Sequence, residues 1–201
     1  MNFSRTFSLT AAGLLALTAA PIAARAPQAM SPDAAPGTAN PTVGGAVMDA
    51  TKPIGVNVAS APNLTTLVAA AKEADLLSTL SGPGPYTVFA PTNEAFGRLA
   101  AGTVDTLMKP ANQPALAKLL TYHVVPGRIS LDDLAQRIAA GGGAAVLTTV
   151  EGEPITVTHP GGAFLLTDVN GNKSYIETPD VRQSDGIIHI VNGVLIPAKL
   201  G

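Results

Sequence analysis

The chain has 201 residues, of which 46% are hydrophobic and 13% are charged. Its formal net charge of -2 excludes a nucleic-acid-binding protein that depends on a basic surface to displace counterions from phosphates. The chain has no cysteine, which excludes a disulfide-stapled scaffold, a thiolate zinc site and a thiol nucleophile.

Residues 1–26 have the pattern of a secretory signal peptide. Arg5 is the only early charge, and an uncharged, mostly apolar run extends from Leu9 to Ala24. Pro21 interrupts this run before it reaches the roughly 20 apolar residues that a membrane-spanning helix needs. We therefore expect cleavage near Ala24 to Ala26 and export to the periplasm, the cell surface or the medium.

Residues 27–54 are predicted to be a flexible tether. This stretch has no aromatic residue, five prolines and three glycines. A segment of this composition buries too little apolar surface to offset the entropy lost on ordering. The remaining residues, 55–201, show no internal repeat, so we expect one folded domain there.

The first half of this domain is predicted to be mainly helical. Asn63 precedes an i, i+3, i+4, i+7 stripe of apolar residues, so we expect it to cap a helix that continues towards Leu80. A second helix is expected to begin at Ser130, which has capping-box spacing to Asp133. Three short helices are predicted between these two: one around Phe96, one over 103–108 and one over 114–120.

Strands are predicted at two places in the first half and throughout the second half. Tyr86–Phe89 and Tyr122–Val125 are rich in β-branched and aromatic residues. After Gly141–Gly143 the apolar pattern changes to a period of two. Strands are expected there over 146–150, 155–159, 164–169, 174–177 and 187–197. Asn170–Gly171, between two of them, is a strong hairpin signal.

The last predicted strand, 187–197, is apolar on both faces except at His189 and Asn192. A strand of this kind is expected at the centre of a sheet. Asn192 and Gly193 within it indicate a bulge or a bend. Because helices precede strands instead of alternating with them, the predicted fold class is α+β.

The three histidines do not have the spacing of a metal site. His189 alternates with apolar residues, so we expect a hydrogen-bonded interior side chain, whereas His159 precedes a Pro-Gly-Gly turn and is expected at the surface. Asp168–Asn172 lacks the glycine and the glutamate of a calcium loop and is better explained as a hairpin turn. We expect neither a metal nor a cofactor.

The chain also lacks the motifs of common enzymes. It has no nucleophile elbow, no phosphate-binding loop and no dinucleotide fingerprint. Ser184 and Asp185, near His189, suggest a hydrolase relay only if a base lies within reach of the serine, and the sequence does not show one. We therefore expect a protein that is not an enzyme.

Three ordered motifs between about Ala59 and Leu200 resemble the fasciclin-domain family. The motifs are Thr87–Phe96 (TVFAPTNEAF), Tyr122–Gly127 (YHVVPG) and Gly186–Pro197 (GIIHIVNGVLIP). The chain is similar to the single-domain, secreted bacterial members, although Asn93 stands where the family often has aspartate. The resemblance implies a wedge of about seven β-strands with several helices packed at one side and end.

Most residues of these motifs are expected to be structural: Thr87, Phe89, Pro91, Thr92, Asn93, Phe96, His189, Asn192, Gly193 and Pro197. The resemblance implicates the Tyr-His segment in receptor contact for animal members. The candidate partner-binding residues are therefore Tyr122, His123, Val124 and Val125. The alternative is that Tyr122 packs in the core while His123 satisfies a buried polar group.

The resemblance implies binding and adhesion and not catalysis. We expect an exported, monomeric interaction module whose partner is a protein or a component of the cell surface or matrix. The alternative is an extracytoplasmic carrier of an apolar small molecule such as a carotenoid or a lipid. Some family members bind carotenoids, and the low charge of this chain suits an apolar cleft. We expect no nucleic-acid partner and no membrane span.

Overall fold

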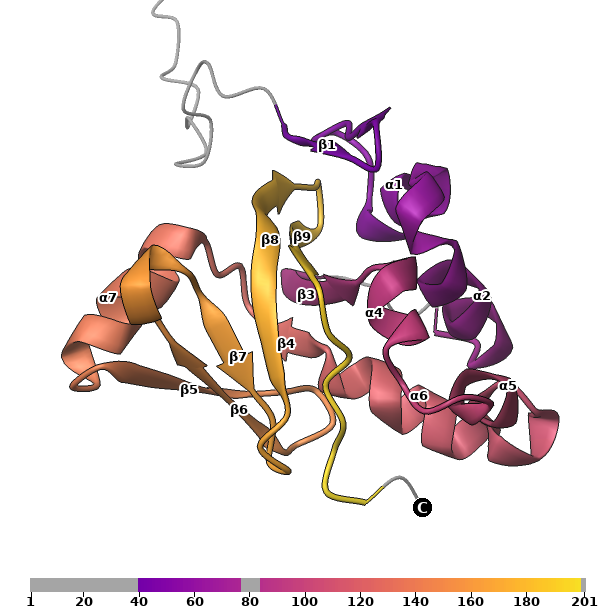
Figure 1. Ribbon diagram of the computed structural model, residues 1–201. Coiled ribbons are helices and arrows are strands. Elements are labelled where there is room, and N and C mark those ends of the chain that lie inside the picture. The colour runs from indigo at the N-terminus through magenta and orange to yellow at the C-terminus, as the bar shows by residue number, and fades with distance from the viewer. Residues whose placement is uncertain (1–39, 77–83, 200–201) are drawn as a thin grey trace, which may run out of the picture. The chain divides into compact units, whose positions relative to one another are not determined.

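A computed structural model describes residues 40–76 and 84–199. The described residues form a seven-stranded mixed sheet with the strand order β4-β3-β9-β8-β7-β6-β5 (Figure 1). The strands are β3 (Tyr86–Pro91), β4 (Val124–Pro126), β5 (Ala144–Thr148), β6 (Pro154–Thr158), β7 (Leu165–Thr167), β8 (Lys173–Arg182) and β9 (Gly186–Val191). The expected signal peptide, 1–26, lies outside the described residues.

The last strand, β9, is central, as its sequence predicts. All six of its residues are buried, and it pairs in parallel with β3 and antiparallel with β8. β9 ends at Val191 and not at Pro197, because Asn192 and Gly193 form a bend. At this bend, side chains accept hydrogen bonds from backbone amides: the Tyr175 amide donates to Asn192 Oδ1 at 2.9 Å, and the Gly193 amide donates to Ser174 Oγ at 2.9 Å.

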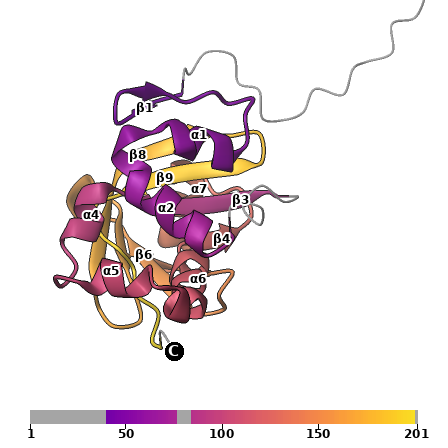
Figure 2. The same ribbon diagram turned by 90° about the vertical axis from the view of Figure 1, so that its right-hand side faces the viewer.

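Most helices cover one side of this sheet. The helices are α1 (Ile54–Ser60), α2 (Thr65–Glu73), α4 (Asn93–Gly97), α5 (Thr103–Leu107), α6 (Gln113–Tyr122) and α7 (Leu131–Ala140), with 3₁₀ turns η1 (Pro62–Leu64), η2 (Pro110–Asn112) and η3 (Pro160–Gly162). Figure 2 shows α1, α2, α4, α5 and α6 on the same side of β3, β8 and β9. α7 packs against β5 and β6. The predicted α+β class, with helices at one side and end of the strands, is confirmed.

Two groups of buried apolar side chains form the core. The first lies between the sheet and the helices α1 to α6, and its largest members include Ile54, Leu64, Leu119, Ile188 and Ile190. The second lies beneath α7, and its largest members include Phe89, Tyr122, Leu134, Ile155 and Leu166. Successive side chains of β3 and β9 point to opposite faces, so these two strands contribute to both groups.

The predicted tether, 27–54, is wrong for its second half. β1 (Thr42–Val43) and β2 (Ala46–Val47) form a hairpin, and Val43, Met48 and Ile54 are buried in the core. Isolated apolar residues among prolines and glycines gave no periodic signal in this stretch. The tether prediction for residues 27–39 concerns residues outside the described part.

Asn40 attaches this hairpin to the sheet. Its side-chain Nδ2 donates to the Arg182 carbonyl oxygen at 2.6 Å, and its Oδ1 accepts from the Arg182 amide at 2.9 Å. Between the two strands, Gly44 (φ 58°) and Gly45 (φ 85°) have the left-handed backbone that a two-residue hairpin turn requires. The segment is therefore part of the folded domain.

The helix predicted from Asn63 to Leu80 differs from α2 at its beginning. Asn63 lies inside the turn η1 and does not cap α2. The side chain of Asn93 performs this role, because its Oδ1 accepts from the Thr66 amide at 2.9 Å. α2 ends at Glu73, and the predicted end at Leu80 lies outside the described residues.

The strand predicted over Tyr122–Val125 begins two residues too early. Tyr122 is the last residue of α6, and His123 is the C-cap, whose amide donates to the carbonyl oxygens of Leu120 and Thr121. Only Val124–Pro126 form β4. Aromatic and β-branched residues in a short run do not distinguish the buried end of a helix from a strand.

Candidate functional site

The four predicted partner-binding residues all lie in the core. Tyr122 is 0% exposed, His123 2%, Val124 4% and Val125 3%. Their side chains are out of reach of a partner on the folded domain, so the predicted contact through these side chains is wrong. The alternative reading, a packed tyrosine beside a histidine that satisfies buried polar groups, describes the structure.

Tyr122 connects three segments through its hydroxyl group. The hydroxyl donates to the Pro154 carbonyl oxygen at 2.8 Å and accepts from the Val169 amide at 3.3 Å. Burial raises the pKa of Tyr122 to about 12, so the phenol keeps its proton at every ordinary pH. Tyr122 therefore ties the end of α6 to the start of β6 and to the turn after β7.

His123 is a neutral connector between α6 and the C-terminal segment. Its Nδ1 donates to the Leu119 carbonyl oxygen at 2.8 Å, and its Nε2 accepts from the Leu195 amide at 3.0 Å. The two backbone partners assign this tautomer, since an amide can only donate and a carbonyl can only accept. Burial lowers the pKa of His123 to about 4.

His189 repeats this arrangement at the centre of the sheet. Its Nε2 lies 2.9 Å from the Ile129 carbonyl oxygen, to which it donates, and its Nδ1 accepts from the Asp180 amide at 3.2 Å. The ring stacks on Phe89 at a centroid distance of 5.6 Å, and burial lowers its pKa.

A hydrolase relay at Ser184 and Asp185 gains no support from these contacts. Both ring nitrogens of His189 are engaged by the backbone, so the ring offers no nitrogen to a serine. Asp185 uses its Oδ1 to accept from the Ile54 amide at 2.9 Å, at the start of α1. His159, as expected, is exposed at a turn and lies against Phe164.

The polar residues of the first motif hold the domain together. Thr87 donates its hydroxyl to the Gly127 carbonyl oxygen at 2.7 Å and accepts from the Ile129 amide at 2.9 Å. Thr92 caps α4 by accepting from the Ala95 amide at 3.3 Å. The apolar members Phe89, Pro91 and Phe96 are buried.

Asn93 makes contacts that the sequence did not reveal. Besides its bond to α2, its Nδ2 donates to the Pro62 carbonyl oxygen at 3.1 Å and to Thr65 Oγ1 at 2.9 Å. An aspartate in this position has no proton to give to Pro62. Asparagine, unlike the aspartate that the family often has here, can therefore donate the hydrogen bond to the Pro62 carbonyl oxygen.

Asp168 is a structural carboxylate and not a calcium ligand. Its Oδ1 accepts from the amides of Asn170 and Asn172, both at 2.9 Å, which closes the hairpin turn that Asn170–Gly171 predicts. Its Oδ2 accepts from Asn172 Nδ2 at 2.8 Å and from the Ile196 amide at 2.8 Å. Within residues 40–76 and 84–199 no group of three or more His, Cys, Asp or Glu could hold a metal ion.

The cavities lined by residues that the structure describes do not favour a carrier of carotenoid or lipid. A small apolar cavity between α1, α2 and α6 has about 20 Å³, and Val58, Leu67 and His123 are among its lining residues. This volume holds about one water molecule. Two surface grooves, of about 530 Å³ along α5 and α6 and about 420 Å³ between α7 and η3, are open to solvent and would leave much of an apolar ligand exposed.

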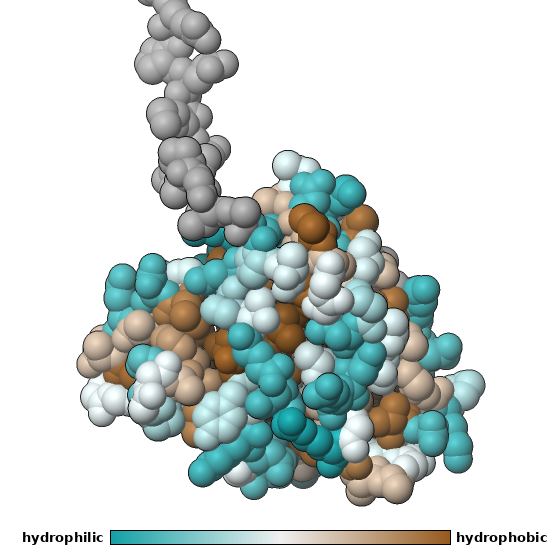
Figure 3. Space-filling view, turned by 45° about the horizontal axis from the view of Figure 1, so that its top comes forward, coloured by the Kyte–Doolittle hydropathy of each residue, from teal (hydrophilic) through white to brown (hydrophobic). Residues whose placement is uncertain are grey.

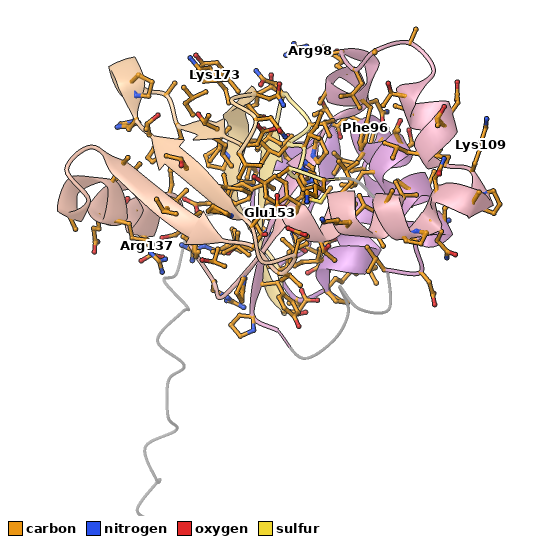
Figure 4. The ribbon with its side chains drawn as sticks, turned by 90° about the horizontal axis from the view of Figure 1, so that it is seen from below. Phe96, Arg98, Lys109, Arg137, Glu153 and Lys173 are labelled. Atoms are coloured by element: carbon orange, nitrogen blue, oxygen red, sulfur yellow. The ribbon has the colours of Figure 1, made fainter. Side chains whose placement is uncertain are left out.

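The face of the domain drawn in Figure 3 has no large patch of only hydrophobic or only hydrophilic residues. Hydrophobic and hydrophilic residues are interspersed on the face drawn in Figure 3. Figure 4 shows Arg98, Lys109 and Lys173 pointing outward from separate places, while Phe96 points inward. In the described part, no single helix meets the length and hydropathy of a bilayer span, although α1 and Pro62–Glu73 meet them together as a pair bent by 100°.

Comparisons with known proteins agree on one family. A family model described as the Fasciclin domain matches residues 62–197. Protein sll1483 of Synechocystis is 44% identical over 133 residues, which cover 66% of this chain and 67% of that protein. The cell surface glycolipoprotein MPB83 of Mycobacterium bovis is 33% identical over 167 residues, which cover 79% of this chain and 67% of that protein.

A solved structure matches the fold. It is a FAS1 domain pair from the insect cell adhesion molecule fasciclin I, with a TM-score of 0.65 and 18% sequence identity. The match covers 74% of this chain, which spans about half of that structure (52%).

Proposed function

Because this chain belongs to the fasciclin-domain family, we propose that it is an exported, non-catalytic interaction module that acts in cell adhesion or in association with a cell surface or matrix. The match of residues 62–197 to the Fasciclin domain carries this proposal. Two similar proteins are named as a cell surface glycolipoprotein and as a cell adhesion molecule.

The geometry supports a binding role over a catalytic one. The buried histidines and Asp168 use their polar atoms in hydrogen bonds that join backbone segments. These groups are thereby unavailable as a base, a nucleophile or a metal ligand. What the domain presents to other molecules is its outer surface.

The partner is a protein or another component of the cell surface or matrix. Since the Tyr-His segment is buried, contact must come from exposed side chains and from backbone at the sheet edge. Several large apolar side chains are exposed, and the most exposed are Val47 (78%) and Val146 (66%). Exposed apolar residues of this kind contribute to interfaces when they lie together.

Export follows from the secretory pattern of residues 1–26. We infer that the mature chain acts in the periplasm, at the cell surface or in the medium after cleavage near Ala24 to Ala26. Residues 27–39 then connect the new amino terminus to the folded domain.

A deletion strain tests both parts of this proposal. Cells without the gene should attach less to surfaces or to neighbouring cells, and the full-length chain should restore attachment. A chain without residues 1–26 is the matched control, because it should fold inside the cell and fail to restore attachment. Unchanged attachment after deletion, together with no surface component captured by the purified protein, would contradict the adhesion role.

A further inference from the structure

After β9 the chain continues as an extended segment that has no strand partner. Residues 193–198, here called the C-terminal strap, follow the bend at Asn192. Figure 1 shows the strap running from β9 between the strands β7 and β8 on one side and the helices α4 and α6 on the other. Among the described residues, no amide or carbonyl group of the strap is hydrogen-bonded to another backbone group. Side chains of the rest of the domain therefore hold the strap in place.

Three amides of the strap donate to titratable side chains from three different places in the fold. The bonds join the Leu195 amide to His123 Nε2 at 3.0 Å, the Ile196 amide to Asp168 Oδ2 at 2.8 Å and the Ala198 amide to Glu153 Oε2 at 2.6 Å. The acceptors follow α6, follow β7 and precede β6, respectively.

Protonation weakens each of these three acceptors. A protonated imidazole carries a hydrogen on both nitrogens, so the Nε2 of His123 then faces the Leu195 amide with a second donor. A carboxylate that gains a proton loses the charge that strengthens its hydrogen bonds. Acid therefore acts in the same direction on all three bonds.

The neutral contacts of the strap are fewer. Ser174 Oγ accepts from the Gly193 amide at 2.9 Å, and Asn170 Nδ2 donates to the Ile196 carbonyl oxygen at 2.7 Å. Neither side chain titrates. These contacts resist acid, but they leave the Leu195 and Ala198 amides without an acceptor.

Other ionisable groups lie on the elements that flank the strap: Arg98 after α4, Lys118 and Tyr122 on α6, Glu151 before β6 and Lys173 on β8. Arg98 donates to the Asn192 carbonyl oxygen at 2.9 Å, whereas Lys118 and Glu151 pair with each other at 3.2 Å. The negative charge of Asp168 acts on His123 and favours its protonated form.

The strap covers His123 and carries apolar side chains into both core groups. Val194 is 7% exposed and belongs to the first group, and Leu195 is 0% exposed and belongs to the second. Because the Leu195 amide caps the Nε2 of His123, a strap that lifts away gives this ring access to water. Lifting also removes two apolar side chains from the core.

We propose that the C-terminal strap is released by acid: when His123, Asp168 and Glu153 take up protons, residues 193–198 leave the domain while the sheet stays folded. β9 keeps its backbone ladder to β3 and β8, and protons do not remove these bonds. The released domain exposes apolar surface that the closed domain buries. This conformational switch does not depend on the proposed adhesion role.

His123 sets the pH range of the release. Burial lowers the pKa of His123 to about 4 in the closed domain, whereas a histidine in water titrates near 6.5. The strap is therefore most stable above pH 6.5, and the open form binds more protons as the pH falls towards 4. With the ring in water in the open form, the equilibrium constant for opening rises on the order of 100-fold from pH 7 to pH 4.5.

Hydrogen exchange of the purified wild-type protein, measured by NMR between pH 7 and pH 4.5, tests the proposal. After correction for the intrinsic pH dependence of exchange, the protection factors of the Leu195 and Ile196 amides should fall on the order of 100-fold. The β9 amides should stay more protected than the strap at every pH. Strap protection that is independent of pH, or that equals the protection of β9 throughout, would overturn the proposal.

Two histidine variants assign the pH dependence to one ring. His123→Gln keeps a donor and an acceptor but does not titrate, so the protection of the Leu195 amide should become nearly independent of pH. His159→Gln, at an exposed histidine, is the matched control and should behave like the wild type. A pH dependence at Leu195 that persists in folded His123→Gln would refute the part assigned to His123.

Glu153→Gln is the second arm, and it remains informative if His123→Gln does not fold. Glu153 is half-buried, and glutamine keeps an oxygen that accepts from the Ala198 amide but has no charge. Exchange at Ala198 should be faster at pH 7 in this variant, while Leu195 keeps its pH dependence. Glu177→Gln, at an exposed residue of β8, should change neither amide. An unchanged exchange rate at Ala198 in Glu153→Gln would contradict the role of the carboxylate.

Discussion

Two buried, neutral histidines of this domain link separate backbone segments through hydrogen bonds. His123 and His189 each donate one ring nitrogen to a carbonyl oxygen and accept an amide proton with the other. A neutral imidazole is the one side chain that does both with a rigid ring. Protonation converts the accepting nitrogen into a donor that faces an amide proton, and it places a charge in the core.

The free energy of unfolding should therefore fall as the pH falls from about 6.5 towards 4. A histidine in the unfolded chain titrates near pH 6.5, whereas His123 titrates at about 4 in the folded domain. Between these values the unfolded chain binds more protons at His123 than the folded domain does, which lowers the free energy of unfolding by about 1.4 kcal/mol per pH unit. Urea denaturation at several pH values measures this slope.

Exposed His159 provides the control for this pH dependence. The His159→Gln variant should keep the slope of unfolding free energy against pH. The His123→Gln variant, if it folds, should lose the part of this slope that His123 contributes. Carboxylates such as Asp133 act at lower pH, since hydrogen bonds lower the pKa of Asp133 below its ordinary 3.8. Stability that does not change between pH 6.5 and 4.5 would contradict the connector role.

The Tyr122 hydroxyl is the second residue-level prediction. Tyr122→Phe keeps the buried ring but leaves the Pro154 carbonyl and the Val169 amide without their partner. We expect a loss of roughly 1–3 kcal/mol in the free energy of unfolding, measured by chemical denaturation. Tyr175→Phe is the comparison, because Tyr175 is 41% exposed and its change should have little effect. Equal stability of the two variants would mean that water replaces both partners.

At the scale of single elements, α7 depends on its first turn. Ser130 Oγ accepts from the Asp133 amide at 3.2 Å, and Asp133 Oδ2 accepts from the Ser130 amide at 2.9 Å, which completes the predicted capping box. Ser130→Ala should lower the free energy of unfolding by about 1 kcal/mol. It should also raise the pKa of Asp133 towards 3.8, because the Ser130 hydroxyl group also donates to this carboxylate.

NMR titration of the Asp133 carboxyl group measures this pKa, and thermal unfolding measures the stability. Ser184→Ala, at an exposed serine beside β9, is a suitable control. A Ser130→Ala variant with an unchanged Asp133 pKa would show that the backbone amide alone maintains it.

Elements with a local signal were predictable from the sequence. The strands after Gly143 alternate apolar and polar residues, and the Ser130 capping box and the Asn170–Gly171 turn depend on neighbouring residues. β1 and β2 have no such local signal. Their hairpin is attached to the sheet by hydrogen bonds between Asn40 and Arg182, which is far away in the sequence. The order of this segment therefore depends on tertiary contacts, which its local composition does not reveal.

The candidate site was harder to predict than the fold. The family resemblance suggested that the Tyr-His motif contacts a partner, and the motif itself was predicted to be a strand. Tyr122 instead ends a helix, and β4 behind it is covered on both faces.

At the scale of the whole molecule, the C-terminal segment after β9 is held by side chains from distant elements. His123, at the end of α6, accepts from the Leu195 amide, and Asp168, after β7, accepts from the Ile196 amide. Asn170 Nδ2 also donates to the Ile196 carbonyl oxygen at 2.7 Å. This extended segment therefore depends on contacts that link the helical side of the domain to the β7–β8 hairpin.

Asp168→Ala should release this segment before it unfolds the domain. The change removes the acceptor for the Ile196 amide and for two amides of the hairpin turn, and we expect a loss of about 2–3 kcal/mol in global stability. Hydrogen exchange should accelerate more at Ile196 than at the amides of β9, which keep their ladder to β3 and β8. Asp132→Ala, an exposed acidic residue on α7, should change neither rate. If exchange at Ile196 and in β9 increased equally in Asp168→Ala, the segment would be part of one cooperative unit with the sheet, and the role of Asp168 as a local clamp would be wrong.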